Sequence, residues 1–109
     1  ELVERKQKPT PSHSPRYNIW RYNTGKGFTT KDSYAFEHPA MFPEALARDH
    51  ILTWTEEGDV VLDPFMGAGT TAIMAYDTNR QFVGFEIDEK YFSICQRRIA
   101  ERNNSVFNK

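Results

Sequence analysis

Residues 60–71, which read VVLDPFMGAGTT, decide the fold of this 109-residue chain. Three branched apolar residues lead into Asp63, and a glycine-rich turn then leads into a segment with helical spacing. Glycines let the backbone approach another group without side-chain interference, and the first turn of a helix presents free N–H groups. The stretch therefore predicts a strand, a tight turn and a helix N-terminus that together form a ligand-binding edge.

A second acid follows a second apolar segment. Residues 81–85, QFVGF, lead into Glu86, 23 positions after Asp63. In a Rossmann-type sheet, an acid at about this distance accepts hydrogen bonds from the ribose hydroxyls of an adenosine-containing ligand. Ile87 would then lie against the adenine ring. The spacing therefore predicts parallel strands with the ligand at their carboxyl ends.

The first acid precedes the glycines, and this order favours a cationic ligand. Asp63 can meet an ammonium group directly or through water, and Phe65 can place an aromatic face near a cation. S-adenosylmethionine (SAM) carries both an ammonium and a sulfonium, whereas a nicotinamide cofactor carries a pyrophosphate. The sequence therefore points to SAM as the cofactor.

Two other interpretations of the same residues stay open. Gly67-x-Gly69-x-x-Ala72 also satisfies the loose dinucleotide pattern, so the chain could be a nicotinamide-binding fragment of an oxidoreductase. Alternatively, Asp63 could cap its strand and Glu86 could be an ordinary surface acid.

Three segments resemble DNA methyltransferases that modify exocyclic amino groups, the N6-adenine and N4-cytosine enzymes. The segments are HPAMFP at 38–43, DPFMGAGTT at 63–71 and GFEID at 84–88, and the resemblance covers about residues 17–109. It implies an α/β fold, a partial Rossmann-like SAM-dependent methyltransferase fold with parallel strands and flanking helices. It also implies DNA as a partner and a place in restriction–modification.

The resemblance further implies which residues bind SAM. Glu86 would hold the ribose, beside Ile87. The methionine end and the turn would be held by His38, Pro39, Phe42, Asp63, Phe65, Gly67, Gly69, Thr70 and Thr71. Phe42 and Met66 could instead belong to the core, as large apolar residues beside turns commonly do. No metal site is expected.

The catalytic segment of that family is not found in this sequence. It consists of Asp, Asn or Ser followed by Pro-Pro and an aromatic residue, and no Pro-Pro pair occurs here. An exocyclic amine is a poor nucleophile, so its hydrogens need acceptors and the flipped base needs a stacking partner. Cys95 lies in an amphipathic helical pattern without a preceding proline, and we expect it in the core. We therefore assign no catalytic residue.

The order of segments suggests a permuted enzyme in which catalysis and target recognition come first. The chain is then interpreted as its C-terminal SAM-binding part, either an expressed fragment or a truncated gene product. Its partner would be the missing catalytic half. A non-catalytic module that binds SAM or DNA remains an alternative.

Charge divides the chain into two regions. Residues 1–31 hold seven Lys/Arg and two Asp/Glu, whereas residues 32–109 hold seven Lys/Arg and thirteen Asp/Glu. We interpret residues 1–31 as a basic extended arm, the trailing end of a target-recognition region that touches DNA weakly. A merely solvated tail is the alternative. Residues 32–109 form the SAM-binding portion.

Cellular location is inferred from what the sequence lacks. No apolar stretch approaches the ~20 residues of a membrane span, no secretory signal is apparent, and the one cysteine excludes a disulfide within the chain. We expect a cytoplasmic protein of a prokaryote or phage, associated with the nucleoid, without membrane contact.

Local patterns predict the secondary structure. Strands are expected at 17–22, 60–62 and 81–85. Helices are expected from Pro43 to a turn at Glu57-Gly58-Asp59, from Thr70 to about Asp77, and after an Asp88 N-cap to about Arg102. The first helix should bury a stripe of Leu46, Ala47, His50, Ile51 and Trp54. The second should pack through Ile73, Met74 and Tyr76.

Overall fold

A computed structural model describes residues 17–25 and 27–107. The elements follow in the order η1 (a 3-10 helix, Ser33–Glu37), α1 (Glu44–Trp54), β1 (Val60–Asp63), α2 (Thr70–Asp77), β2 (Gln81–Gly84) and α3 (Glu89–Phe107). Of the basic extended arm expected at residues 1–31, positions 1–16 and 26 lie outside the described residues. No helix in the described part of the chain is long and apolar enough to cross a membrane.

The two strands form a parallel pair joined through α2. Val60 is paired with Gln81, and Asp63 is paired with Gly84, so both strands end at the same edge. Parallel neighbours need a crossover connection, and α2 provides it. Strands at 60–63 and 81–84 confirm the predicted parallel α/β arrangement, within a residue at each strand's end.

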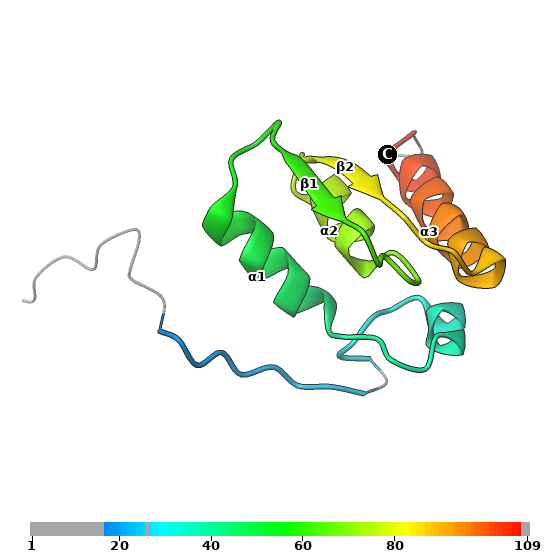
Figure 1. Cartoon of the computed structure of the whole chain (residues 1–109), viewed down its shortest axis with the longest axis horizontal. Helices are drawn as coiled ribbons and strands as arrows, with labels where there is room; N and C mark the ends of the chain where they lie inside the picture. The colour runs from blue at the N-terminus through cyan, green and yellow to red at the C-terminus, as the bar shows by residue number, and fades with distance from the viewer. Residues whose placement is uncertain (1–16, 26, 108–109) are drawn as a thin grey trace, which may run out of the picture.

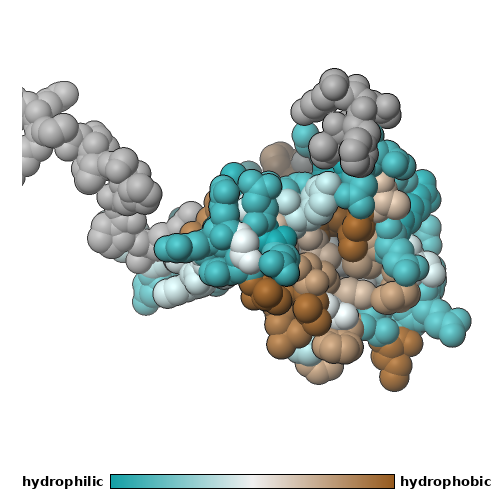
Figure 2. Space-filling model, turned by 90° about the horizontal axis from the view of Figure 1, so that it is seen from above, coloured by the Kyte–Doolittle hydropathy of each residue, from teal (hydrophilic) through white to brown (hydrophobic). Residues whose placement is uncertain are grey.

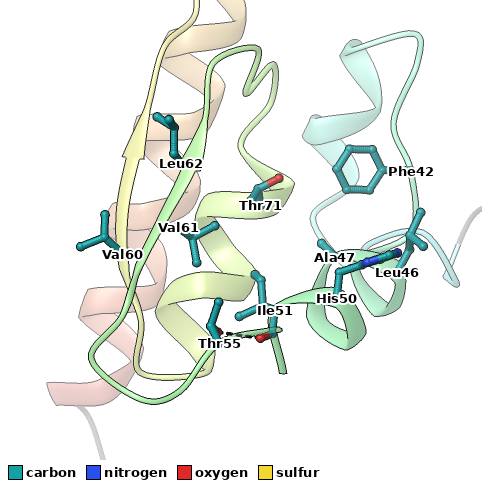
Figure 3. Close-up of a pocket in the computed structure, with 10 residues that line it drawn as sticks. All are labelled: Phe42, Leu46, Ala47, His50, Ile51, Thr55, Val60, Val61, Leu62 and Thr71. Atoms are coloured by element: carbon teal, nitrogen blue, oxygen red, sulfur yellow. Dashed lines mark hydrogen bonds between the residues drawn. The ribbon is translucent and has the colours of Figure 1, made fainter. Parts of the chain in front are cut away.

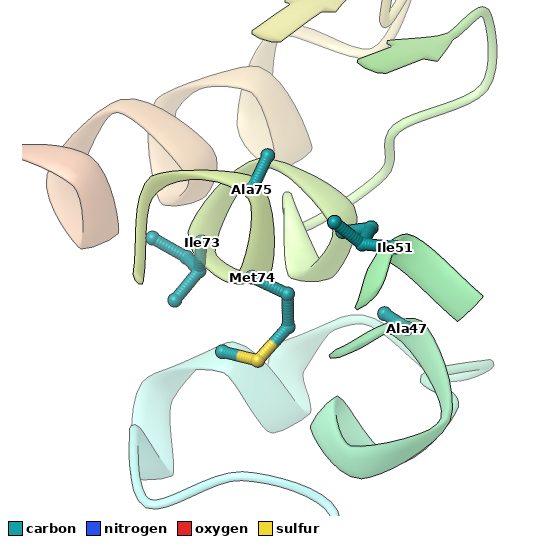
Figure 4. Close-up of a cluster of buried hydrophobic side chains, with 5 residues drawn as sticks. All are labelled: Ala47, Ile51, Ile73, Met74 and Ala75. Atoms are coloured by element: carbon teal, nitrogen blue, oxygen red, sulfur yellow. The ribbon is translucent and has the colours of Figure 1, made fainter. Parts of the chain in front are cut away.

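Helix α2 is the centre of the molecule. It contacts both strands and packs between α1 and α3 (Figure 1). Figure 4 shows the side chains where α1 meets α2, and this cluster consists of Ala47, Ile51, Ile73, Met74 and Ala75. The small alanines let the two helices approach closely, while the longer side chains fill the space between them. Ile73 and Met74 are buried as the sequence predicted, whereas Tyr76 is 37% exposed.

Two smaller clusters join α3 to the turn between β1 and α2. Ala68 packs against Ala35 and Ile94, while Met66 packs against Ala72 and Cys95. Helix α3 therefore packs directly against the glycine-rich turn. Cys95 is 1% exposed, which confirms its predicted place in the core.

Within the described residues, the sheet is covered on one face only. Val61 and Phe82 pack against the core, whereas Val60 and Leu62 are 57% and 63% exposed. Val83 on β2 is also partly exposed, at 45%. Figure 2 shows apolar side chains, in brown, gathered in groups on the surface between the polar ones. A strand with alternate apolar residues on both faces is typical of a sheet that is buried on both sides.

The predicted strand at residues 17–22 is wrong. This segment is irregular and runs beside α1, where the Trp20 and His50 rings lie 4.2 Å apart between centroids. The Tyr22 hydroxyl donates to Asp49 Oδ2 at 2.9 Å. A strand needs a neighbouring backbone with free groups, and the backbone groups of a helix are already paired with each other. Aromatic composition alone misled the prediction.

The helices differ from prediction mainly at their ends. Helix α1 begins at Glu44 with Pro43 as the N-cap and ends at Trp54, before the predicted turn at 57–59. Trp54 is 75% exposed rather than part of the buried stripe. The stripe is buried only at Ala47 and Ile51, where α2 covers it. Helix α3 continues to Phe107, beyond the predicted end.

The predicted N-cap of α3 is confirmed. Asp88 Oδ1 accepts the N–H groups of Lys90 at 2.9 Å and Tyr91 at 3.1 Å.

Candidate cofactor site

The glycine-rich turn connects the end of β1 to the first turn of α2. Gly67 and Gly69 have φ angles of 51° and 80°, a region that side chains other than glycine rarely adopt. A Cβ at Gly67 would lie 2.8 Å from His38 Nε2, and a Cβ at Gly69 would overlap Cys95 Sγ. The turn therefore needs both glycines for its own packing, in addition to any ligand that it approaches.

Asp63 stands at the end of β1 with both carboxylate oxygens engaged. Oδ1 accepts the Phe65 N–H at 3.0 Å, and Oδ2 accepts the Thr71 hydroxyl at 2.6 Å. These bonds hold the carboxylate in one orientation at the mouth of the turn. Each oxygen keeps a second lone pair, so the group can still accept from a cationic ligand. The carboxylate is thus oriented before a ligand arrives.

Glu86 follows β2 and closes the other side of the turn. Its Oε2 accepts the Gly67 N–H at 2.8 Å, and its Oε1 accepts the Asp88 N–H at 2.9 Å. Glu86 therefore links the glycine turn to the start of α3. Each carboxylate oxygen of Glu86 keeps a second lone pair, so the group can still accept hydrogen bonds from two hydroxyls. Asp63 and Glu86 thus flank one turn from the carboxyl ends of adjacent parallel strands.

His38 lies against the turn from a distant part of the sequence. Its ring packs on Tyr91 of α3, with 4.3 Å between centroids and 53° between planes. Its Nδ1 accepts the Ala40 N–H at 3.2 Å, which leaves Nε2 directed at Gly67. The structure therefore brings His38 to the predicted turn, while Pro39 next to it is exposed.

Phe42 shares a groove with one other predicted residue, Thr71. It lines an open groove of about 490 Å³ between α1 and β1, on the opposite side from Leu62 and Thr71 (Figure 3). The groove walls are almost entirely apolar, and its lining residues are Phe42, Leu46, Ala47, His50, Ile51, Thr55, Val60, Val61, Leu62 and Thr71. Ligand pockets combine apolar walls with a few converging polar groups. This groove offers few such groups, so it suits an apolar protein segment better than a charged cofactor.

A second, shallower groove begins at Glu86. Its lining residues are Glu86, Ile87, Glu89, Phe92 and Ser93. Ile87 is 99% exposed and Phe92 is 39% exposed, so two apolar side chains stand in solvent beside a carboxylate. The prediction missed Phe92. Phe92 lies four residues after the Asp88 N-cap, and this position near the start of α3 was the sequence signal that placed it close to Glu86.

The predicted residues thus divide into three groups. His38, Asp63, Gly67, Thr71 and Glu86 converge on the turn through the contacts above. Phe65 lies in the turn and Ile87 directly follows Glu86, and they are 89% and 99% exposed. The remaining four lie elsewhere: Gly69 is buried within the turn, Thr70 is buried at the start of α2, Pro39 is exposed beside His38, and Phe42 lies in the groove between α1 and β1.

The described residues hold no evident nucleophile or metal centre. Burial raises the pKa of the Cys95 thiol, so the thiolate form is disfavoured. In residues 17–25 and 27–107 no three His, Cys, Asp or Glu side chains are arranged to hold a metal ion. The site's carboxylates and turn can bind and orient a ligand.

Solved structures define the class of protein. The crystal structure of the M1.HpyAVI–SAM complex aligns with this chain at 38% sequence identity and a TM-score of 0.55. The alignment covers 56% of this chain and 32% of the M1.HpyAVI chain. The cytosine-N4-specific PvuII DNA methyltransferase matches 71% of this chain and 28% of its own, at 29% identity and a TM-score of 0.58. The fold is that of the Rossmann-like SAM-dependent methyltransferases.

Sequence comparison identifies the family. A family model described as DNA methylase, for the N6/N4 class, matches residues 2–97. The orphan methyltransferase M.BamHII of Bacillus amyloliquefaciens is 55% identical over 84 residues, which are 77% of this chain and 32% of M.BamHII. The chain belongs to the N6/N4 DNA methylase family, which confirms the resemblance. It spans about a third of the length of M.BamHII, and nothing in these comparisons favours an oxidoreductase fragment or a non-catalytic module.

Proposed function

We propose that this chain is the SAM-binding part of a DNA methyltransferase that modifies an exocyclic amino group of adenine or cytosine. One observation carries the proposal. Asp63 ends β1, Glu86 follows the adjacent parallel strand β2 by two residues, and both engage the glycine turn that precedes α2. Ligands of open parallel α/β sheets bind at this carboxyl edge. The combination provides acceptors for an ammonium group at one end and for a ribose at the other.

Each group of the site has a role in this proposal. Asp63 accepts from the methionine ammonium, and the exposed ring of Phe65 lies near the positive charge. Glu86 accepts from the ribose hydroxyls through its remaining lone pairs. His38 supports the turn and offers Nε2 on the methionine side.

The adenine ring would occupy the shallow groove beside Glu86. Ile87 and Phe92 are exposed there, and a flat apolar ring between them would remove both from water. Burial of apolar surface favours binding by roughly 25 cal/mol per Å². This assignment gives an energetic reason for a fully exposed isoleucine at the edge of the site.

Calorimetry with SAM, its demethylated product and NAD tests the cofactor assignment. We expect SAM and the demethylated product to bind and NAD to give no heat. Binding of NAD without SAM would overturn the proposal. Methyl transfer is tested with tritium-labelled SAM and duplex DNA, with heat-killed protein as the control. Because the Pro-Pro-aromatic segment is missing from the sequence, we expect no transfer above that control.

The rest of a methyltransferase chain is the partner that we propose for the groove between α1 and β1. In the described residues the sheet holds only β1 and β2, so one edge of β1 is unpaired beside this groove. An apolar strand added to that edge would pair the backbone of β1, and its side chains would lie beside those of Val60 and Leu62. The matched relatives have about two thirds of their length outside the match, enough to supply such a strand.

The part of M.BamHII outside its matched region is a usable probe for this docking. We expect it to form a one-to-one complex with this chain when the two are co-expressed. Leu62→Lys should abolish the complex, whereas Leu52→Lys, at a partly exposed α1 position that does not line the groove, should leave it intact. Equal association of both variants would contradict the proposed surface.

DNA contact by the basic region and a place at a prokaryotic nucleoid complete the proposal. They rest on the excess of Lys/Arg in residues 1–31 and on membership in a DNA methylase family. A cationic segment binds DNA through its phosphates without reading the sequence. Such contacts would add affinity but no target specificity.

A further inference from the structure

Arg98 of α3 is a fully buried cation with an acceptor for every N–H group. Its side chain is 0% exposed, and a guanidinium has five N–H donors. The acceptors and their distances are Asp32 Oδ2 at 2.9 Å, Glu44 Oε1 at 2.7 Å, Ala68 O at 2.9 Å, Thr70 Oγ1 at 3.3 Å and Thr30 Oγ1 at 3.3 Å. A buried charge is tolerated when its partners satisfy it in this way.

These acceptors come from three separate parts of the chain. Asp32 and Thr30 precede η1, Glu44 is the first residue of α1, and Ala68 belongs to the glycine turn. The Thr30 hydroxyl also donates to Glu44 Oε1 at 2.5 Å, which closes a small network around the guanidinium. One side chain therefore ties α1 and the preceding segment to the turn of the cofactor site.

The bond to Ala68 bears directly on the shape of the turn. The Ala68 carbonyl and the Gly69 N–H belong to one planar peptide and point in opposite directions. Arg98 holds the carbonyl on one side, and Met66 O accepts the Gly69 N–H at 2.8 Å on the other. Glycines on both sides of Ala68 would otherwise allow this peptide to rotate, because glycine populates both signs of φ.

We propose that Arg98 is a positioning residue of the SAM site, which fixes the Ala68–Gly69 peptide before the cofactor binds. The inference rests on the proposed function. Its basis is the guanidinium bond to a carbonyl inside the turn, which lies between the Asp63 and Glu86 sides of the site. Preorganised groups bind more tightly because less ordering is lost on binding. A change at Arg98 should thus weaken SAM binding more than its effect on stability explains.

Arg98→Lys tests this with two controls. Arg97→Lys is the same change on the next residue of α3, where the guanidinium is exposed and bonded to Glu101. Glu44→Gln weakens an ion pair of Arg98 and leaves the bond to Ala68 in place. SAM affinity is measured by calorimetry at a temperature at which circular dichroism shows all variants folded. We expect Arg98→Lys to lose about tenfold in affinity, the scale of one hydrogen bond to a charged group.

The controls separate positioning from structure. Glu44→Gln should lower the unfolding temperature but keep SAM affinity within twofold, and Arg97→Lys should change neither by much. If Arg98→Lys also binds SAM within twofold of the parent while losing stability, Arg98 is structural only and the proposal is wrong.

Amide hydrogen exchange on folded protein gives a readout that does not depend on SAM affinity. In the parent protein without SAM, the Gly69 amide should exchange slowly, because its peptide is held on both sides. Fast exchange that slows only on addition of SAM would overturn the proposal. If the parent bound no SAM, the proposed function would fail, whereas slow Gly69 exchange that Arg98→Lys accelerates and Arg97→Lys does not would still establish the positioning of the turn.

Discussion

Gly69 faces Cys95 so closely that no Cβ atom fits between them. A Cβ built on Gly69 would overlap Cys95 Sγ and lie 2.9 Å from Cys95 Cβ. The glycine turn thus rests directly on α3, with Met66 Sδ also 3.9 Å from the same sulfur. Since Arg98 follows on the same face of α3, this helix determines both the depth and the orientation of the turn.

Gly69→Ala should destabilise the protein by about 2–5 kcal/mol. A positive φ costs an alanine roughly 1–2 kcal/mol, and overpacking of the core adds about 1–3 kcal/mol. Gly58→Ala is the matched control, because Gly58 has φ of 88° but no atom within 4 Å of its Cβ position. Urea unfolding of Gly58→Ala should therefore show only the loss of stability that comes from the positive φ, without the packing contribution.

Cys95→Ala separates the two contributions at Gly69. Combined with Gly69→Ala, it should recover part of the lost stability, because it removes the overlapping sulfur. An equal loss for Gly69→Ala and Gly58→Ala, with no recovery in the double variant, would show that packing against Cys95 is unimportant.

Asp63→Ala and Glu86→Ala should each weaken SAM binding by ~1.5–3 kcal/mol, because each removes a charged hydrogen-bond acceptor. Titration calorimetry against the parent protein measures the loss. Glu57→Ala, at an exposed acid between α1 and β1, is the control for a general loss of negative charge and should bind SAM normally. Should both site variants bind as tightly as the parent, the cofactor assignment would be wrong.

Local pattern sufficed for the elements that form the ligand-binding edge. The strand, turn and helix at 60–77, the second strand and the Asp88 cap are encoded by near neighbours in sequence, and the structure contains them. The strand prediction for residues 17–22 failed because a strand needs a partner strand, and here the neighbouring element is helix α1. Sequence patterns describe what a segment can do, and tertiary contacts select among the possibilities.

The role of Arg98 shows a second limit of sequence reasoning. Helical spacing predicts that Arg98 shares the apolar face of α3 with Ile94 and Cys95, and the structure buries all three. No periodicity could identify its acceptors, however, because they lie 28 to 68 positions away. A charged residue on a predicted apolar face was the available signal for a buried network.

Tyr34 should make stability depend on alkaline pH. Burial, and then the hydrogen bond from its hydroxyl to Glu101 Oε2 at 2.6 Å, raise the pKa of Tyr34 from 10.0 to about 12. The folded state therefore holds this proton more tightly than the unfolded state. Its contribution to stability is fully present below pH 10 and is lost as the pH rises toward 12.

Urea unfolding of the parent protein and of Tyr34→Phe at several alkaline pH values measures this. Phenylalanine cannot ionise, so the stability of the parent relative to Tyr34→Phe should be constant below about pH 9 and should fall between pH 10 and 12. A constant difference across this range would mean that the Tyr34–Glu101 bond does not couple to folding.

DNA affinity should depend on the bases that precede the described residues. Replacing Arg5, Lys6 and Lys8 by Gln should weaken binding to duplex DNA of any sequence and flatten its salt dependence, by a slope of about 1 for each phosphate that is no longer neutralised. The triple substitution keeps the contacts of Trp20 and Tyr22 with α1 and the hydrogen bond between Thr30 and Arg98. Truncation at residue 32 would remove those interactions and confuse binding with folding.

The matched control removes three exposed bases from the acidic region, at Arg48, Lys90 and Arg97. Because thirteen acids surround them in residues 32–109, these bases should contribute little to a polyanion, and DNA affinity should change less than in the Arg5, Lys6 and Lys8 variant. Fluorescence anisotropy with labelled duplex at several salt concentrations measures both. If the two triple variants lose affinity equally, or if the parent shows no salt dependence, the basic region is a tether rather than a DNA-binding segment.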